Sequence, residues 1–183
     1  WDKRTVIKNR LHFMISNDRA KILLELDKET KEKHYILPNP NEVLSIELIA
    51  LNEHFQNEIF NLDINRKYMS FSKRTFQSRV QQTIILRRLD FEGGHRNPEI
   101  SFVPQNLDDN ILDLMKKYEN VKFDKETHIH FYIDGYGEKW AFPVKEFDLF
   151  NTNSLFEQAK EFCKYCNIKD IPEFTQKDLL CMA

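Results

Sequence analysis

Apolar and polar residues alternate over several short stretches of the chain, which is the pattern of β-strands that bury one face. The first two, EVLSIELIAL (42–51) and HFQNEIFNLDINR (54–66), are separated by the polar turn at Asn52 and Glu53. THIHFYI (127–133) alternates in the same way, and the GYG turn after it indicates a hairpin. We predict strands over 42–51, 54–66, 67–74, 81–94, 127–133 and 135–144.

Three other stretches space their apolar residues at helical intervals. They are 18–33, with Asn17 or Asp18 as its cap, 108–118, and 154–166. The last opens with Ser154 followed three residues later by Glu157, which is a capping box. We therefore predict three amphipathic helices.

The order of these elements is a helix, a run of strands, an inserted helix, a hairpin and a closing helix. This order predicts an α+β fold with a mostly antiparallel sheet that is covered on one face. The 183 residues fit one domain, 1–183, with a helical insertion at about 105–124.

The composition is that of a packed globular protein, with 41% hydrophobic and 13% aromatic residues against four glycines. No apolar run approaches the roughly 18–20 residues of a membrane span, so we expect no membrane partner. The odd number of cysteines, Cys163, Cys166 and Cys181, does not fit a secreted disulfide framework. We expect a cytoplasmic protein in which the CKYC stretch (163–166) serves packing.

Charge is unevenly distributed along the chain. The formal net charge of −2 argues against a protein that simply coats nucleic acid. Residues 64–97, however, hold eight Lys/Arg against two Asp/Glu, so the rest of the chain is acidic. This basic stretch is either a solvated sheet face or a surface that contacts the phosphates of RNA or DNA.

Candidate chemistry gathers at two places. His128, His130 and Tyr132 share one face of a strand whose other face is apolar, so they point to solvent or to a groove. The loop GGHRNP (93–98) could meet this strand if strand 81–94 is its neighbour. Arg87 and Arg88 lie on opposite faces of strand 81–94, and alternation alone leaves open which one joins the histidines. The candidate catalytic residues are His95, His128, His130 and Tyr132, and the candidate binding residues are Arg66, Arg79, Arg88, Arg96, Asn97, Lys139 and Trp140.

Three chemistries fit these residues, and exposed histidines without any such role also fit. Two histidines two apart on a strand can share a metal ion, but only His95, Asp90 and Asp134 are available as further ligands and nearby arginines repel a cation. We therefore expect no metal and no other cofactor. Acid–base cleavage of RNA needs a base, an acid and a cation, which His, Tyr and Arg supply. Recognition of phosphate or of an acidic partner is the third.

Five segments in a fixed order carry a family resemblance. They are LDINR (62–66), SRVQQTIILRRLD (78–90), HRNP (95–98), HIHFYIDGYGEKWAFP (128–143) and YCNI followed by Pro172. In this pattern the chain resembles an uncharacterised bacterial family common in Firmicutes and their prophages and mobile elements. The resemblance maps Arg88, His95, His128, His130, Tyr132 and Trp140 onto positions that recur in that family.

The chain departs from the family pattern in two places. About 25 residues separate the HRNP loop from the histidine strand, where the family has a short connection. Position 87 is usually aliphatic in the family and is Arg87 here. The resemblance therefore implies that residue 87 faces the core and that Arg88 shares the face of the histidines.

The resemblance implies a setting of phage–host conflict and no particular reaction. Our leading hypothesis is a non-enzymatic inhibitor of the anti-CRISPR type, which binds a protein or nucleoprotein defence complex and contacts nucleic acid through residues 64–97. The alternative is a metal-independent endoribonuclease toxin. In it His95 or His130 is the base, His128 or Tyr132 is the acid, and Arg88 and Arg96 hold the phosphate. An ordinary interaction module is a third hypothesis.

Overall fold

The computed structural model describes residues 14–67 and 72–176. The helices are α2 (Asn17–Glu25), α3 (Asp109–Tyr118) and α4 (Leu155–Tyr165), and two short 3-10 turns span Glu53–Phe55 and Val144–Glu146. The strands are β1 (Lys28–Thr30), β2 (His34–Leu37), β3 (Val43–Ala50), β4 (Phe60–Asn65), β5 (Arg74–Val80), β6 (Ile84–Phe91), β7 (His95–Arg96), β8 (Lys122–Phe123), β9 (His128–Ile133), β10 (Gly137–Pro143) and β11 (Glu173–Gln176).

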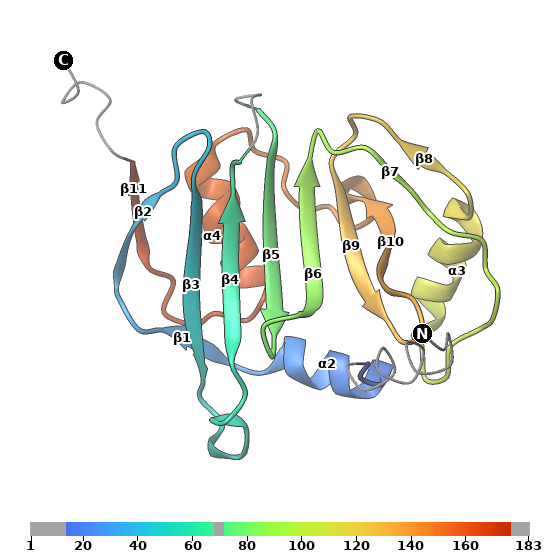
Figure 1. The fold of residues 1–183 in the computed structure, drawn as a ribbon, viewed down its shortest axis with the longest axis horizontal. Coiled ribbons are helices and arrows are strands. Elements are labelled where there is room, and N and C mark those ends of the chain that lie inside the picture. Colours follow the sequence, from blue (N-terminus) through green and yellow to red (C-terminus); the bar gives the residue numbers. More distant parts are fainter. Residues whose placement is uncertain (1–13, 68–71, 177–183) are drawn as a thin grey trace, which may run out of the picture.

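One seven-stranded sheet dominates the molecule (Figure 1). Its strand order is β1-β3-β4-β5-β6-β9-β10, and each neighbouring pair is antiparallel. The expected α+β class with a mostly antiparallel sheet is confirmed. Of the predicted strand 67–74, residues 68–71 lie outside the described residues, and β5, which begins at Arg74, was not predicted over 75–80.

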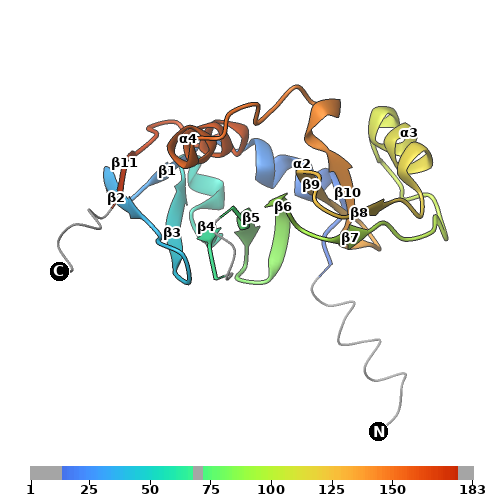
Figure 2. The ribbon, with the colours of Figure 1, turned by 90° about the horizontal axis from the view of Figure 1, so that it is seen from above.

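The helices α2 and α4 lie on the same side of this sheet, as Figure 2 shows from above. The apolar half of each alternating strand faces them. On the other side of β3–β6, no helix of the described residues lies over the sheet (Figure 2). We call this side the polar face, and define it by Ser45, Asp63, Gln77, Arg79, Arg88 and Asp90.

A β-bulge in β6 decides which arginine reaches the polar face. Ser78 pairs with Arg87, whereas Arg79 pairs with Ile85, so the register shifts by one residue at Leu86. The shift reverses the alternation, and Arg87 turns to the helix side, where its Nε donates to the Tyr165 hydroxyl at 3.3 Å. The simple alternation assumed for 81–94, which put Ile84, Leu86, Arg88 and Asp90 on one face, is therefore wrong. Arg88 and Asp90 remain on the polar face, and for Arg88 this is the face that the family resemblance implied.

The first helix is shorter than its pattern predicted. Ser16, rather than Asn17 or Asp18, is the N-cap, and its hydroxyl accepts from Arg19 N at 3.2 Å. The helix ends at Glu25, so the prediction of helix up to residue 33 is wrong. Residues 28–30 form an edge strand instead, because Lys28 is drawn into the interior and its backbone pairs with that of Ala50 on β3.

Lys28 is a fully buried lysine that joins the ends of two helices. Its Nζ donates to the carbonyl oxygens of Leu24 (3.0 Å), Leu26 (2.6 Å) and Cys166 (3.1 Å), at the C-termini of α2 and α4. Burial lowers the pKa of Lys28 to about 8. We expect Lys28→Met to lower the free energy of unfolding by about 2–3 kcal/mol, because three carbonyls lose their donor. Urea unfolding followed by circular dichroism measures this change.

Lys31→Met is the matched control, because Lys31 lies close by and is exposed, with an ion pair to Glu47 at 2.6 Å. An exposed pair of this kind contributes at most about 1 kcal/mol. Equal stability of the two variants would show that the buried ammonium does not hold the helix ends.

The closing helix confirms its prediction closely. The Ser154 hydroxyl accepts from Glu157 N at 3.4 Å, and Ala159, Phe162 and Cys166 are fully buried. Burial raises the pKa of the Cys166 thiol to about 11 and also raises the pKa of Cys163. A reactive thiol has a lowered pKa, so the packing role expected for CKYC agrees with the structure.

Two small strand pairs were not predicted. β2 and β11 pair in parallel beside the main sheet, and β7 and β8 form a short antiparallel ribbon. Each strand in these pairs has two to four residues, too few for alternation to identify. Among the described residues, no helix has the length and apolar character that a membrane span requires.

Candidate functional site

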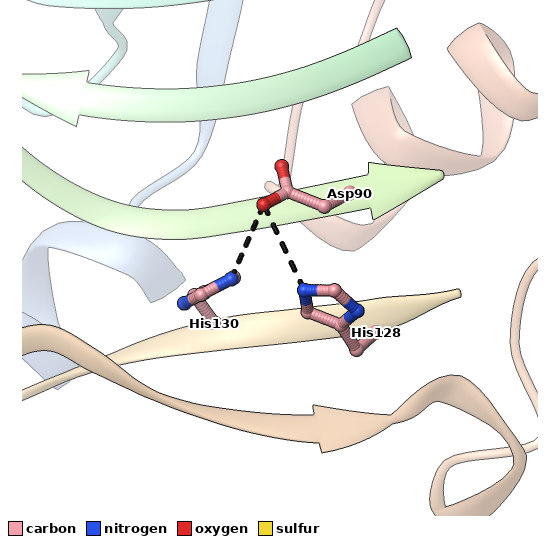
Figure 3. A group of neighbouring side chains, drawn as sticks. All are labelled: Asp90, His128 and His130. Carbon is pink, nitrogen blue, oxygen red and sulfur yellow. Dashed lines mark ion pairs between the residues drawn. The ribbon is translucent and has the colours of Figure 1, made fainter. Parts of the chain in front are cut away.

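The site begins with the pairing of two neighbouring strands. On β6 and β9, Arg88 lies directly opposite His130, and Asp90 lies directly opposite His128. Side chains that are opposite one another on the same face of an antiparallel pair are in contact range. Figure 3 shows the result: the Asp90 carboxylate extends from β6 toward both histidines of β9.

The ribbon β7–β8 covers the two histidines. The ring of His95 lies 4.5 Å from that of His130, and the ring of Phe123 stacks on His128 at 5.1 Å. Both β9 histidines are 0% exposed. The expectation that they face solvent or an open groove is therefore wrong, because a two-residue strand from the HRNP loop pairs with one from the insertion and covers this part of the polar face. The meeting of the HRNP loop with the histidine strand is confirmed.

Backbone carbonyls determine which ring nitrogens carry protons. His128 Nδ1 lies 2.8 Å from the carbonyl oxygen of Glu126, and His130 Nδ1 lies 2.9 Å from that of Glu138. A carbonyl oxygen can only accept, so each Nδ1 carries the proton and donates it. In the neutral ring, Nε2 then presents a lone pair. Both Nε2 atoms face Asp90.

Three electron-rich atoms converge at this point. Asp90 Oδ2 lies 3.2 Å from His130 Nε2 and 3.8 Å from His128 Nε2, and all three atoms lie within 4.8 Å of one another. Arg88 supplies positive charge to two of them, since its Nε donates to Asp90 Oδ2 (3.1 Å) and its Nη2 to His130 Nε2 (2.8 Å). His128 Nε2 has no hydrogen-bond partner among the described residues, although it is completely buried.

The surroundings keep two of these groups in their metal-binding protonation states. Burial alone would raise the pKa of Asp90, but the neighbouring His130 and the charge of Arg88 outweigh burial and leave that pKa at about 2. Burial lowers the pKa of His128, more than the hydrogen bond to Glu126 raises it. Asp90 is therefore a carboxylate and His128 a neutral imidazole at neutral pH.

The two separations between the carboxylate and the histidines fit a small divalent cation. In a tetrahedral zinc site with bonds of about 2.0–2.1 Å, the ligand atoms lie about 3.3 Å apart. The separations of 3.2 and 3.8 Å between Asp90 and the two histidines bracket that value. Metal-bound histidines also commonly donate their other ring nitrogen to a backbone carbonyl, as both histidines do here.

His95 lies beside this group and is not one of its converging atoms. Its Nε2 donates to the carbonyl oxygen of Lys139 at 2.9 Å and lies 3.1 Å from Asn97 Oδ1. Burial and the neighbouring His130 lower the pKa of His95 to about 4. A neutral His95 can still act as a base, but a neutral His128 is a poor general acid at pH 7, which weakens the acid–base interpretation in which His128 is the acid.

Three of the predicted site residues serve the fold. The Tyr132 hydroxyl accepts from Ile15 N (2.8 Å) and donates to Ile15 O (3.0 Å), so it ties the N-terminal segment to β9. Trp140 is 0% exposed in the core. Asn97 is 1% exposed, and its amide bonds to the backbone of Ala141 on the edge strand β10.

The basic stretch 64–97 is divided among several surroundings. Arg79 binds Asp63 on the polar face (2.7 Å), and Arg66 Nη1 donates to Pro38 O at 2.9 Å. Arg96 donates to Asn120 O at 2.8 Å. Lys139, a predicted binding residue outside this stretch, has an exposed side chain. Arg74 and Arg87 face the helix side, over the rings of Phe91 and Phe131 respectively. The stretch is therefore not one continuous basic surface.

Sequence reasoning undervalued Asp90 and overlooked a second carboxylate on the polar face. Asp90 was considered only as a minor metal ligand, yet it is the residue that both histidines face. Asp63 accepts hydrogen bonds from Ser45, Gln77 and Arg79. Burial would raise its pKa, but these bonds leave it below its ordinary value. Its position in the strand pattern, alternating with Leu62 and Ile64, was the available signal.

The fold and this cluster define an α+β protein with a buried His–His–Asp group on one face of an antiparallel sheet. The chain belongs to a family of unknown function, DUF6978, whose family model matches residues 15–168. The comparisons with curated proteins and with solved structures gave no match.

Proposed function

We propose that the protein binds one divalent metal ion, preferably Zn²⁺, through Asp90, His128 and His130, and that the ion serves a reaction. The observation that carries this proposal is the buried, unpartnered Nε2 of His128, which faces the same carboxylate oxygen as the Nε2 of His130. A completely buried ring nitrogen without a partner costs free energy, and a metal ion satisfies it.

The donor set supports the choice of metal. Two imidazoles and one carboxylate suit Zn²⁺ and its neighbours among the transition metals, and are poor ligands for Mg²⁺ or Ca²⁺. Three protein ligands leave the fourth tetrahedral position for water or substrate, which is typical of catalytic rather than structural zinc sites.

From the sequence we expected several nearby arginines to repel a metal ion, but most of them do not lie at the proposed site. Arg87 lies on the other side of the sheet, and Arg79 is paired with Asp63. Among the described residues, Arg88 is the arginine in contact with the proposed ligands, and its charge is balanced by Asp90. The ion would replace Arg88 Nη2 at His130 Nε2, while the guanidinium can keep its Nε on the carboxylate.

The test is a titration of metal-free protein with Co²⁺, which occupies zinc sites and gives visible ligand-field absorption. We expect uptake of one equivalent, with the intensity of a four- or five-coordinate ion, and displacement of Co²⁺ by Zn²⁺. The control His54→Ala, which removes an exposed histidine far from the site, should bind in the same way. Absence of saturable uptake at micromolar Co²⁺ would refute the proposal.

The two functions expected from the sequence stay predictions. An inhibitor of a nucleic-acid-handling defence complex requires a partner, and the division of the basic stretch gives it no added support. In the metal-independent ribonuclease a neutral His95 suits the role of base, whereas the lowered pKa of His128 makes it a poor acid and the Tyr132 hydroxyl is engaged by the backbone of Ile15.

A further inference from the structure

A small polar hollow adjoins the proposed metal ligands. Its volume is about 270 Å³, and its lining includes Lys73, Gln77, Arg88, Asp90, Gly93 and Gly94. Arg88 and Asp90 belong both to this hollow and to the histidine cluster, whereas His128 and His130 are completely buried behind them. The hollow is therefore the side from which a second ligand can approach the cluster.

Arg88 stands between the hollow and the cluster with part of its hydrogen-bonding capacity unused. Its Nε and Nη2 are engaged by Asp90 and His130, but its Nη1 has no partner among the described residues. Gln77, the neighbouring donor, is already committed to Asp63 at 2.7 Å. The unused edge of the guanidinium makes the hollow suitable for an anion.

Metal binding would release more of this arginine. A metal ion takes the lone pair of His130 Nε2, so Arg88 Nη2 must leave that atom. With both Nη atoms free of protein, the guanidinium can offer a planar pair of N–H groups, which is the geometry that binds phosphate oxygens in a bidentate way. Arg88 therefore has two alternative partners for Nη2, namely His130 and an oxyanion in the hollow.

Gly93 leaves space beside Asp90 in the wall of the hollow. A Cβ at Gly93 would lie 3.1 Å from Asp90 Cβ, which is tighter than ordinary contact, so a side chain there would press on the proposed ligand. A hollow of this volume has room for a phosphate group and short substituents, and the Arg88 guanidinium beside the proposed metal ion would favour an anionic group over a neutral one.

We propose that a phosphate ester binds in this hollow through Arg88, and that it and the metal ion bind cooperatively because Arg88 moves from His130 to the phosphate. This inference rests on the proposed metal site and names the substrate class of that site. Coupling of this kind is reciprocal, so each ligand raises the affinity of the other by the same factor.

The test measures Co²⁺ affinity with and without millimolar dimethyl phosphate, a phosphodiester monoanion, with chloride at equal ionic strength as the reference. In the unaltered protein we expect dimethyl phosphate to raise the affinity for Co²⁺ by roughly fivefold or more. In Arg88→Gln, we expect Co²⁺ to bind more tightly without the phosphodiester, since the competing cation is gone, and the phosphodiester to have no further effect. Lys160→Gln, which removes a positive charge from α4, should behave like the unaltered protein.

The outcomes separate the two proposals. Co²⁺ binding that does not respond to dimethyl phosphate would overturn the cooperative phosphate site and leave the metal site intact. An equal response in the unaltered protein and in Arg88→Gln would overturn the role given to Arg88. Failure to bind Co²⁺ in any of these conditions would refute the metal site itself, and the phosphate proposal with it.

Discussion

Replacing His128 by alanine is expected to lower the affinity for Zn²⁺ and Co²⁺ by roughly 100-fold or more, because loss of a direct ligand exceeds the 10–100-fold effect of an outer partner. His128 is the most informative position for this test. Its Nε2 has no hydrogen-bond partner among the described residues, so the replacement breaks no other bond of that atom. Asp90→Asn should have a comparable effect, because it replaces the carboxylate that both histidines face with a neutral amide. Competition against a chromophoric chelator measures the affinities.

His95→Ala is the matched comparison, and it separates the metal site from the catalytic set expected from the sequence. The ring of His95 contacts that of His130, but its Nε2 donates to the carbonyl oxygen of Lys139. We expect His95→Ala to change the metal affinity by less than about tenfold. This is less than the effect of removing a group that is hydrogen-bonded to a metal ligand. An equal loss in His95→Ala and His128→Ala would show that the ion lies elsewhere in the cluster.

A control on folding is needed because His128 is buried. The removal of its ring leaves a space next to Phe123, so we also expect some loss of stability. His128→Gln keeps more of the volume and a hydrogen-bonding group. If both variants remain folded by circular dichroism and both lose the metal, the loss comes from the ligand and not from the cavity.

The alternation in THIHFYI was sufficient to predict both a strand and the shared face of its polar residues. The capping box at Ser154 similarly predicted the start of α4, because both patterns depend only on residues close in the chain. The long-range choices were beyond this kind of reasoning. The bulge at Leu86 reverses the faces of β6 without any glycine or proline to mark it, and the pairing of His95 with Phe123 joins residues from two separate loops.

The burial of the histidines follows from that second pairing, and it changed the interpretation of the site. Polar residues opposite an apolar face are expected to meet water. Here the β7–β8 ribbon excludes water from them, so the same residues become buried groups that need partners. The sequence therefore indicated the two histidines of this cluster but undervalued Asp90, and the absence of a partner at His128 Nε2 among the described residues could come only from the structure.

Asn97 is the residue that holds this ribbon against the sheet. Its Nδ2 donates to Ala141 O (2.8 Å) and Tyr118 O (3.0 Å), and its Oδ1 accepts from Ala141 N (2.9 Å). One side chain thus satisfies both backbone groups at an edge position of β10 and connects that strand to the end of α3. Because the two bonds to Ala141 are buried and the bond to Tyr118 is partly buried, Asn97→Ala is expected to lower the free energy of unfolding by about 3 kcal/mol.

Urea unfolding of Asn97→Ala beside Asn110→Ala measures this effect, since Asn110 is exposed in the first turn of α3 and its replacement should change stability by less than about 0.5 kcal/mol. Hydrogen exchange should also accelerate at the Ala141 amide, which loses its acceptor, more than at core amides of β4. The sequence had assigned Asn97 to ligand binding. If Asn97→Ala were as stable as the unaltered protein, Asn97 would again be a candidate for ligand binding. The β7–β8 ribbon would then be held over the histidines by other contacts.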